Sequence, residues 1–178
     1  MSNVHLTGYV PGAIGAITQL HGTYYSQHWD LGVYFEAKVA AELAAFLNRF
    51  DPAHDGLWLA RDGEKVVGAV VIDGRDAQGE GARLRWFIID PAYQGLGLGN
   101  RLMDAAMSFC QQVGFRRVYL TTFAGLHTAR HLYEKHGFKL CREEDGSHLT
   151  GKSSLIEQVF ERIAPGERVA SLKNETNV

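Results

Sequence analysis

A run of alternating glycines, Gln94-Gly95-Leu96-Gly97-Leu98-Gly99, is the segment of this sequence that points most directly to chemistry. It follows an apolar stretch ending at Asp90-Pro91 and precedes the amphipathic segment 98–113. A loop that opens a helix presents unpaired backbone N–H groups at the positive end of the helix dipole, so it can bind phosphate. Glycine lets the backbone approach such an anion because no Cβ stands in the way. We therefore predict a phosphate-binding loop.

Two nucleotide-binding motifs with similar glycines do not fit this loop. A dinucleotide fingerprint requires an acidic residue about 20 positions later, at the end of the next strand. The next apolar stretch, 118–123, ends without Asp or Glu. A P-loop requires Gly-Lys followed by Ser or Thr, whereas Asn100 and Arg101 follow Gly99. The remaining alternatives are a turn without a ligand and a phosphate site of another kind.

The composition sets broad limits on the class of protein. A chain of 178 residues, 46% hydrophobic and 21% charged, is typical of one globular domain. The formal net charge of −2 and the absence of a long Lys/Arg run argue against a nucleic-acid partner. No window approaches the roughly 20 apolar residues of a membrane span, and residues 1–10 do not resemble a signal peptide. Cys110 and Cys141 lack metal-ligand spacing, so we expect reduced thiols, no metal site and a cytoplasmic location.

Hydrophobic periodicity predicts an α+β fold around one mixed sheet. The stretch 4–16 is expected to be a short strand, then a turn at Pro11-Gly12 and the start of a helix. The spacing of 155–163 favours a strand but also permits a helix. We expect one domain over 1–164 and a polar, flexible tail over 165–178. The other predicted strands are 57–60, 66–72, 82–89, 117–123 and 138–142, and the predicted helices are 31–50, 98–113 and 128–136.

The sequence resembles the GCN5-related N-acetyltransferases, the GNAT superfamily, in two segments. Residues 94–99 match its Gln/Arg-x-x-Gly-x-Gly/Ala signature, and 128–138 resemble its Ala-x-x-x-Tyr-x-x-x-Gly-Phe segment, in the same order. The resemblance covers 57–163 and implies a three-layer fold, with helices on both faces of a mostly antiparallel sheet. Residues 21–25 and 35–40 are similar to acetyltransferase domains fused to MarR-type regulators. Nothing here resembles a helix-turn-helix, so no DNA-binding role is carried over.

The resemblance implies acetyl-CoA as the co-substrate. The backbone of Phe87, Ile88 and Ile89 would pair with the amides of its pantetheine arm. His127 stands near a position where relatives contact the coenzyme. Arg101 suits a phosphate because a guanidinium binds one bidentately, although it also fits a solvated helix surface. The residues expected to hold the pyrophosphate are Gln94, Gly95, Leu96, Gly97, Leu98, Gly99, Asn100 and Arg101.

Acetyl transfer requires a proton for the departing thiolate and a way to remove one from the amine. By resemblance, Tyr133 is the general acid, since a phenol with a pKa near 10 stays protonated at neutral pH. The base is open, because the strand 82–89 contains no carboxylate. Glu36 is our first candidate. The alternatives are His21, His28, His127 or a water molecule.

An aromatic cluster in the N-terminal half is expected, by resemblance, to wall the acceptor site. Aromatic side chains bind both apolar groups and ammonium ions, and Arg85 would suit a carboxylate. The expected acceptor is therefore a primary amine of a small molecule or of an amino-acid-like compound. The alternatives are that these aromatics form the core and that the protein is an acyl-CoA-binding sensor with little catalysis; a homodimer is compatible with the sequence. The candidate acceptor residues are Tyr24, Tyr25, His28, Trp29, Arg85 and Trp86.

Overall fold

A computed structural model describes residues 4–147 and 155–164, within which seven strands form one mixed sheet. The strand order is β1-β2-β3-β4-β5-β7-β6. The strands are β1 (Val4–Thr7), β2 (Gly56–Asp62), β3 (Lys65–Asp73), β4 (Ala82–Ile89), β5 (Arg117–Phe123), β6 (Lys139–Asp145) and β7 (Ile156–Ile163). The helices are α1 (Ala13–Trp29), α2 (Val33–Asn48), the 3₁₀ turn η1 (Pro91–Tyr93), α3 (Leu98–Val113) and α4 (His127–Lys135).

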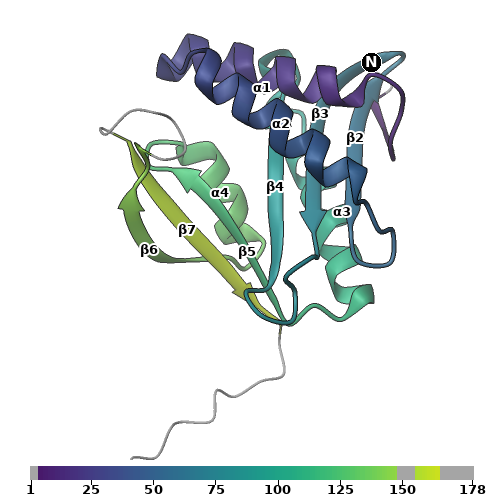
Figure 1. The fold of residues 1–178 in the computed structure, drawn as a ribbon, viewed down its shortest axis with the longest axis vertical. Helices are drawn as coiled ribbons and strands as arrows, with labels where there is room; N and C mark the ends of the chain where they lie inside the picture. The colour runs from purple at the N-terminus through teal and green to yellow at the C-terminus, as the bar shows by residue number, and fades with distance from the viewer. Residues whose placement is uncertain (1–3, 148–154, 165–178) are drawn as a thin grey trace, which may run out of the picture.

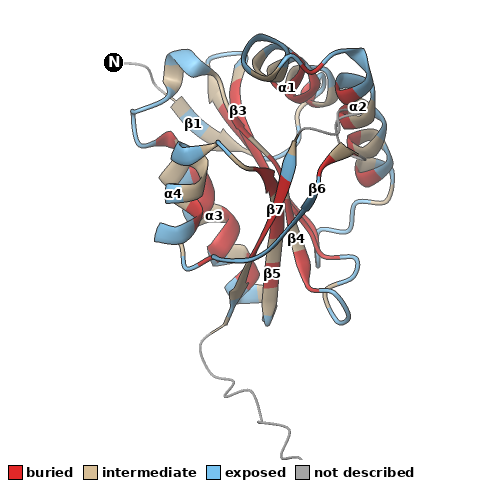
Figure 2. Ribbon diagram, turned by 90° about the vertical axis from the view of Figure 1, so that its left-hand side faces the viewer, coloured by how far each residue is buried: buried red, intermediate tan, exposed pale blue. Residues whose placement is uncertain are grey.

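Helices cover both faces of the sheet, which confirms the predicted three-layer α+β arrangement. Helices α1 and α2 lie on one face, and α3 and α4 lie on the other (Figures 1 and 2). Each face has its own buried cluster: Phe46 and Leu43 belong to the α1/α2 side, and Leu102 and Met103 to the α3 side. Because helices bury apolar side chains against both faces, the sheet lies between two separate cores.

Strands β4 and β5 pair over only a short segment near their beginnings and then diverge. They are parallel and pair only at Ala82↔Val118 and Arg83↔Tyr119, whereas β5 pairs with β7 along its whole length. Beyond Arg83 the two strands diverge, and Figure 1 shows them splayed beneath α1 and α2. The edge of β4 that faces β5 is therefore left without strand partners in its second half.

Strand β4 contains a β-bulge at the point of divergence. Two successive residue pairs with β3, Ala69↔Ile88 and Val71↔Arg85, span one more residue on β4 than on β3. Trp86 has φ 45°, in the left-handed region that is uncommon for a bulky residue and costs about 1–3 kcal/mol. An extra residue reverses the alternation of side chains. Accordingly, Leu84 faces the α3 core before the bulge, and Trp86 and Ile88 face the α1/α2 core after it.

The N-terminal helices differ from the sequence expectation. Periodicity predicted one helix over 31–50 and no element over 22–30, but α1 continues to Trp29, and Asp30 (φ 51°) ends it with its N–H donating to Tyr25 O. Strand β6 also extends to Asp145, beyond the predicted 138–142. Segment 155–163 is a strand, and α3 ends at Gly114 as predicted. The predicted tail 165–178 lies outside the described residues. No helix in the described part of the chain is long and apolar enough to cross a membrane.

Candidate active site

Two hollows meet where β4 and β5 diverge. The first, here called the inner cavity, measures about 130 Å³ and lies between α1, α2 and the splayed strands. The second, here called the outer cleft, measures about 720 Å³ and runs from the end of β4 over the glycine loop to α4. Tyr25, Phe87 and Tyr133 line both hollows. A molecule lying in the outer cleft and one lying in the inner cavity would meet at these three side chains.

The glycine loop forms one wall of the outer cleft. Gly95 (φ 76°) and Gly97 (φ 77°) adopt the left-handed conformation, and Gly97 caps the start of α3. The first N–H groups of a helix have no intrahelical acceptor, so those of α3 are available to an anion. A Cβ on Gly99 would lie 3.1 Å from the Cδ2 atom of Leu132, which shows how closely α3 approaches α4 here.

Most of the residues predicted to bind the donor line the outer cleft, but three do not. Leu98 is buried in the α3 core, and the side chain of Leu96 is 66% exposed. The guanidinium of Arg101 donates to the backbone carbonyl of Val4 (2.9 Å), away from the cleft. The predicted residues that do line the cleft are Phe87, Ile88, Ile89, Gln94, Gly95, Gly97, Gly99, Asn100 and His127.

Lys135 is a cleft residue that the sequence reasoning missed. It lines the outer cleft and its Nζ donates to Asn100 Oδ1 over 2.7 Å, which holds the ammonium beside the first turn of α3. The available signal was its position two residues after Tyr133 in the second matched segment. A lysine at the end of a helix is ordinarily a solvated capping charge, so this signal alone did not identify it.

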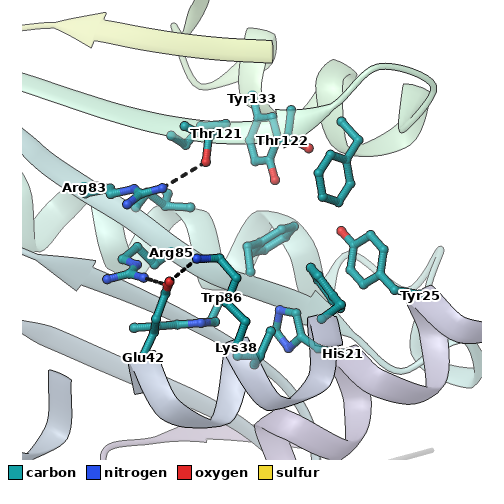
Figure 3. A pocket seen from close by; sticks show the side chains of 16 residues that line it. His21, Tyr25, Lys38, Glu42, Arg83, Arg85, Trp86, Thr121, Thr122 and Tyr133 are labelled. Carbon is teal, nitrogen blue, oxygen red and sulfur yellow. Dashed lines mark hydrogen bonds and ion pairs between the residues drawn. The ribbon is translucent and has the colours of Figure 1, made fainter. Parts of the chain in front are cut away.

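Tyr133 occupies the junction of the two hollows. Its ring is buried among Phe87, Phe138 and Phe160, with centroid distances of 6.0, 6.2 and 6.0 Å. Figure 3 shows its hydroxyl directed into the inner cavity. Within the described residues this hydroxyl has no hydrogen-bond partner, and burial raises the pKa of Tyr133 well above its usual value. The phenol is therefore a protonated donor without an acceptor.

His21 lies on the opposite wall of the inner cavity from Tyr133 (Figure 3). Burial lowers the pKa of His21 to about 4, against the opposing effect of its hydrogen bond to Ile17. Its Nδ1 lies 2.9 Å from Ile17 O. Because a carbonyl can only accept, Nδ1 carries the proton and Nε2 keeps a free lone pair. The ring stacks on Tyr25, with centroids 6.2 Å apart, so His21 is a neutral and fixed acceptor.

Of the four side chains considered as bases, only His21 lines the inner cavity. His28 and His127 line the outer cleft. Glu36, our first candidate, is exposed on α2 and lies against Gly22 of α1, lining neither hollow. The next residue along a helix is turned by about 100°, so the burial of Phe35 directs Glu36 outward. Glu36 therefore lies outside both hollows.

A charged wall closes the inner cavity opposite the aromatics. Glu42 accepts from Lys38 (2.5 Å) and forms a short ion pair with Arg85. Burial acts to raise the pKa of Glu42, but the hydrogen bond from Lys38 and the charge of Arg85 hold it below its usual value. Burial, aided by the neighbouring charge of Arg83, lowers the pKa of Arg85. Arg83 and Arg85, two residues apart on β4, both line this cavity.

The predicted acceptor residues divide between the two hollows. Arg85 and Trp86 line the inner cavity, and Tyr25 lines both hollows. Tyr24, His28 and Trp29 line only the outer cleft, where Tyr24 stacks on His28 with centroids 4.6 Å apart. The sequence could not separate them because the helical path of 13–29 was not recognised. Three of the six therefore line the outer cleft together with the glycine loop rather than the inner cavity.

The splayed sheet and the glycine loop define an acetyltransferase architecture, and the chain belongs to the acetyltransferase (GNAT) family, whose family model matches residues 16–138. A mycothiol acetyltransferase of Geodermatophilus obscurus is 38% identical over 96 residues, which are 50% of this chain and 30% of that protein. An uncharacterised N-acetyltransferase of Escherichia coli, YjgM, is 33% identical over 88 residues, covering 49% of this chain and 53% of its own. The matches thus span about half or less of these curated relatives.

Solved structures share the fold. The spermidine N-acetyltransferase of Vibrio cholerae, in complex with CoA and spermine, superposes with a TM-score of 0.67 over 92% of this chain and 96% of its own, at 19% identity. A GCN5-related N-acetyltransferase of Kribbella flavida gives 0.70 over 90% and 98%, at 16% identity. At these identities the likeness concerns the fold alone.

Proposed function

We propose that this protein is an acetyl-CoA-dependent N-acetyltransferase that acts on a primary amine of a small molecule. The observation that carries the proposal is the position of Tyr133, whose phenol stands at the junction of the outer cleft and the inner cavity. Membership of the GNAT family supports the reaction type. In this assignment the outer cleft receives the donor and the inner cavity receives the amine.

The residues of the outer cleft fit the donor. The open N–H groups at the start of α3 and the ammonium of Lys135 suit a pyrophosphate. The unpaired edge of β4 over Phe87–Ile89 can hydrogen-bond to an extended chain of amides, as in strand addition. When bound, acetyl-CoA supplies a thioester carbonyl carbon as the electrophile. The bulge at Trp86 reverses the alternation of side chains along β4, so it determines how the unpaired edge at Phe87–Ile89 is oriented.

Tyr133 serves as the general acid. As the amine nitrogen forms its bond to the carbonyl carbon, the C–S bond breaks, the sulfur leaves with the electron pair, and the phenol donates its proton to the thiolate; a proton from water then restores the phenol. Burial keeps the phenol protonated at every pH at which such an enzyme works. Positioned proton transfer of this kind contributes about 10²–10⁴-fold to a rate.

His21 orients the amine. With a pKa of about 4 it is too weak a base to deprotonate an ammonium ion, but its Nε2 lone pair can accept a hydrogen bond from a neutral amine. The acceptor amine therefore loses its first proton to solvent before it binds productively. The second proton, released as the C–N bond forms, leaves along this hydrogen bond to Nε2 or to water beside it.

Calorimetry with acetyl-CoA, followed by a free-thiol assay over a panel of primary amines, tests the proposal. We expect donor binding and amine-dependent release of coenzyme A. Donor binding without release for any amine would instead favour an acyl-CoA-binding sensor. Absence of donor binding would contradict both.

A further inference from the structure

The side chains of Arg83 and Arg85 extend from the same face of β4, but among the described residues only Arg85 has carboxylate partners. The guanidinium of Arg85 forms an ion pair with Glu42, lies 3.5 Å from Asp73, and covers the ring of Trp86 at 4.0 Å. Asp73 in turn accepts from Arg49 over 2.5 Å. Arg85 is thus held on several sides by the fold itself. It is a structural residue of the cavity wall, and both of its Nη atoms already have carboxylate partners.

Arg83 has no carboxylate partner among the described residues. One Nη donates to the hydroxyl of Thr121 over 3.1 Å, as Figure 3 shows, and the guanidinium lies over the ring of Tyr119 at 5.8 Å. Its Nε is buried and, within residues 4–147 and 155–164, has no hydrogen-bond partner. Arg83 as a whole is half-buried, but a buried N–H such as its Nε is costly unless another group supplies the missing acceptor.

The charges around the inner cavity have a positive balance. Lys38, Arg83 and Arg85 line it, and Glu42 is the one carboxylate among its lining residues. Glu42 is shared between Lys38 and Arg85, and His21 is neutral at pH 7. The cavity therefore holds one cation in excess of what its own acid and the adjacent Asp73 compensate. That cation is Arg83.

The geometry around Arg83 suits a carboxylate. A guanidinium can bind two carboxylate oxygens in parallel through one of its edges, and Arg83 lines the inner cavity. The Thr121 hydroxyl accepts from Arg83, so its own hydrogen is free to donate to the same anion. The cavity, at about 130 Å³, is small beside the 300–1,000 Å³ of a drug-sized site. Tyr133 and His21 line the same small cavity as Arg83, so one small molecule can contact all three side chains.

We propose that the acceptor is a small amino acid, whose carboxylate is bound by Arg83 and Thr121 while its amine faces His21 and Tyr133. This inference rests on the proposed acetyltransferase function and names its substrate class. It assigns the carboxylate contact to Arg83, two residues before the Arg85 that the sequence favoured. It also excludes polyamines as good acceptors, because further ammonium groups would lie among Lys38, Arg83 and Arg85.

Matched pairs of acceptors test the inference. Free-thiol release is measured for glycine, alanine and serine against glycinamide, alaninamide and serinamide, with spermidine as a polycationic probe. Because the amides are the more acidic amines, the pairs are compared at equal concentrations of neutral amine. We expect kcat/KM to favour the carboxylates by roughly 10- to 100-fold, the effect of a hydrogen bond to a charged group. Activity on amides or spermidine equal to or above that on the amino acids would overturn the inference while leaving the acetyltransferase function intact. No thiol release from any amine would overturn both.

Variants locate the contact. In Arg83→Met, the preference for carboxylate over amide should collapse toward unity, through a rise in KM for the amino acids and little change for the amides. Thr121→Val, which is nearly isosteric and preserves the strand, should reduce the same preference several-fold and serves if Arg83→Met does not fold. Arg85→Met is the comparison, because its loss should lower the melting temperature yet keep the preference. Retention of the preference in both Arg83→Met and Thr121→Val would refute the assignment.

Discussion

The rings of Phe87 and Tyr133 meet edge to face, with centroids 6.0 Å apart and planes inclined at 65°. Phe87 follows the bulge of β4 and Tyr133 belongs to α4, so this contact joins two of the elements that border both hollows. Phe138 and Phe160 complete the packing around the phenol. The ring is thus held by hydrophobic contacts alone, and the hydroxyl is left free for chemistry.

The change Tyr133→Phe tests that separation. The aromatic contacts stay, so the melting temperature and the affinity for acetyl-CoA should be nearly unchanged. Loss of the proton donor should lower kcat about 100-fold or more. Steady-state kinetics with one accepted amine measure the effect, and Tyr9→Phe, at a side chain that is 60% exposed, is the control. A kcat within twofold of wild type would remove Tyr133 from the mechanism.

Lys135 and Arg101 are two cations near the start of α3, and we expect only Lys135 to contribute to acetyl-CoA binding. Lys135 lines the outer cleft, whereas Arg101 donates to Val4 O. Lys135→Gln should weaken acetyl-CoA binding several-fold, by about 1 kcal/mol, and this loss should shrink at high salt. Arg101→Gln should leave the dissociation constant unchanged. Calorimetry at two ionic strengths measures both, and a reversed order would show that the donor phosphates lie on the other side of the helix.

Glu36 and Glu42 lie on the same helix but only Glu42 lines the inner cavity. Glu36→Gln should alter neither kcat nor stability appreciably, because the side chain is exposed. Glu42→Gln removes an anion shared by Lys38 and Arg85, and should destabilise the fold by about 1–2 kcal/mol. Denaturant unfolding and thiol-release kinetics measure the two variants in parallel. A large loss of kcat in Glu36→Gln would restore Glu36 as a candidate base.

The buried His21 makes stability depend on pH in acid. Its pKa is lowered from 6.5 to about 4, so between these values the unfolded chain binds more protons than the folded one. Stability is therefore fully present above pH 6.5 and is lost as the pH falls toward 4, by about 3 kcal/mol in total. His21→Gln should flatten the pH dependence of the free energy of unfolding in this window.

The matched control for His21 is His28. It makes the same backbone contact, Nδ1 to Tyr24 O at 2.9 Å, but it is exposed. His28→Gln should leave the acid slope of the wild type in place. An equal slope in wild type and His21→Gln would show that another group causes the acid destabilisation.

The sequence predicted the parts of the fold that depend on local pattern. The strands of the β2–β3 hairpin, helix α3 and its end at Gly114 follow from periodicity and turn chemistry. The start of helix α1 was predicted, but its continuation to Trp29 was missed because its apolar residues do not form a clean stripe: Gly15 and Gly22 interrupt it, and its C-terminal turns carry aromatics and histidines. Such a helix is stabilised by packing against α2 and the sheet rather than by its own pattern.

The site was harder to predict than the fold, because its residues are defined by their partners. Arg83 and Arg85 lie two residues apart on the same strand, and only the positions of Glu42, Asp73 and Thr121 show that carboxylates neutralise Arg85 while Arg83 contacts a hydroxyl. His21 became the candidate acceptor for the amine because helix α1 brings it to the inner cavity. The glycine loop was found readily, since its chemistry is local to the backbone.

Because of the extra residue at Trp86, the alternation of side chains between the two faces of β4 is reversed after the bulge. Before it, the even-numbered side chains pack under α3; after it, the even-numbered ones pack under α1 and α2. Deleting one residue there would move every later side chain of β4 to the opposite face of the sheet. Phe87 and Ile89, which line the outer cleft, would then face the α1/α2 core. Single substitutions along β4 should thus be tolerated far better than a change of its length by one.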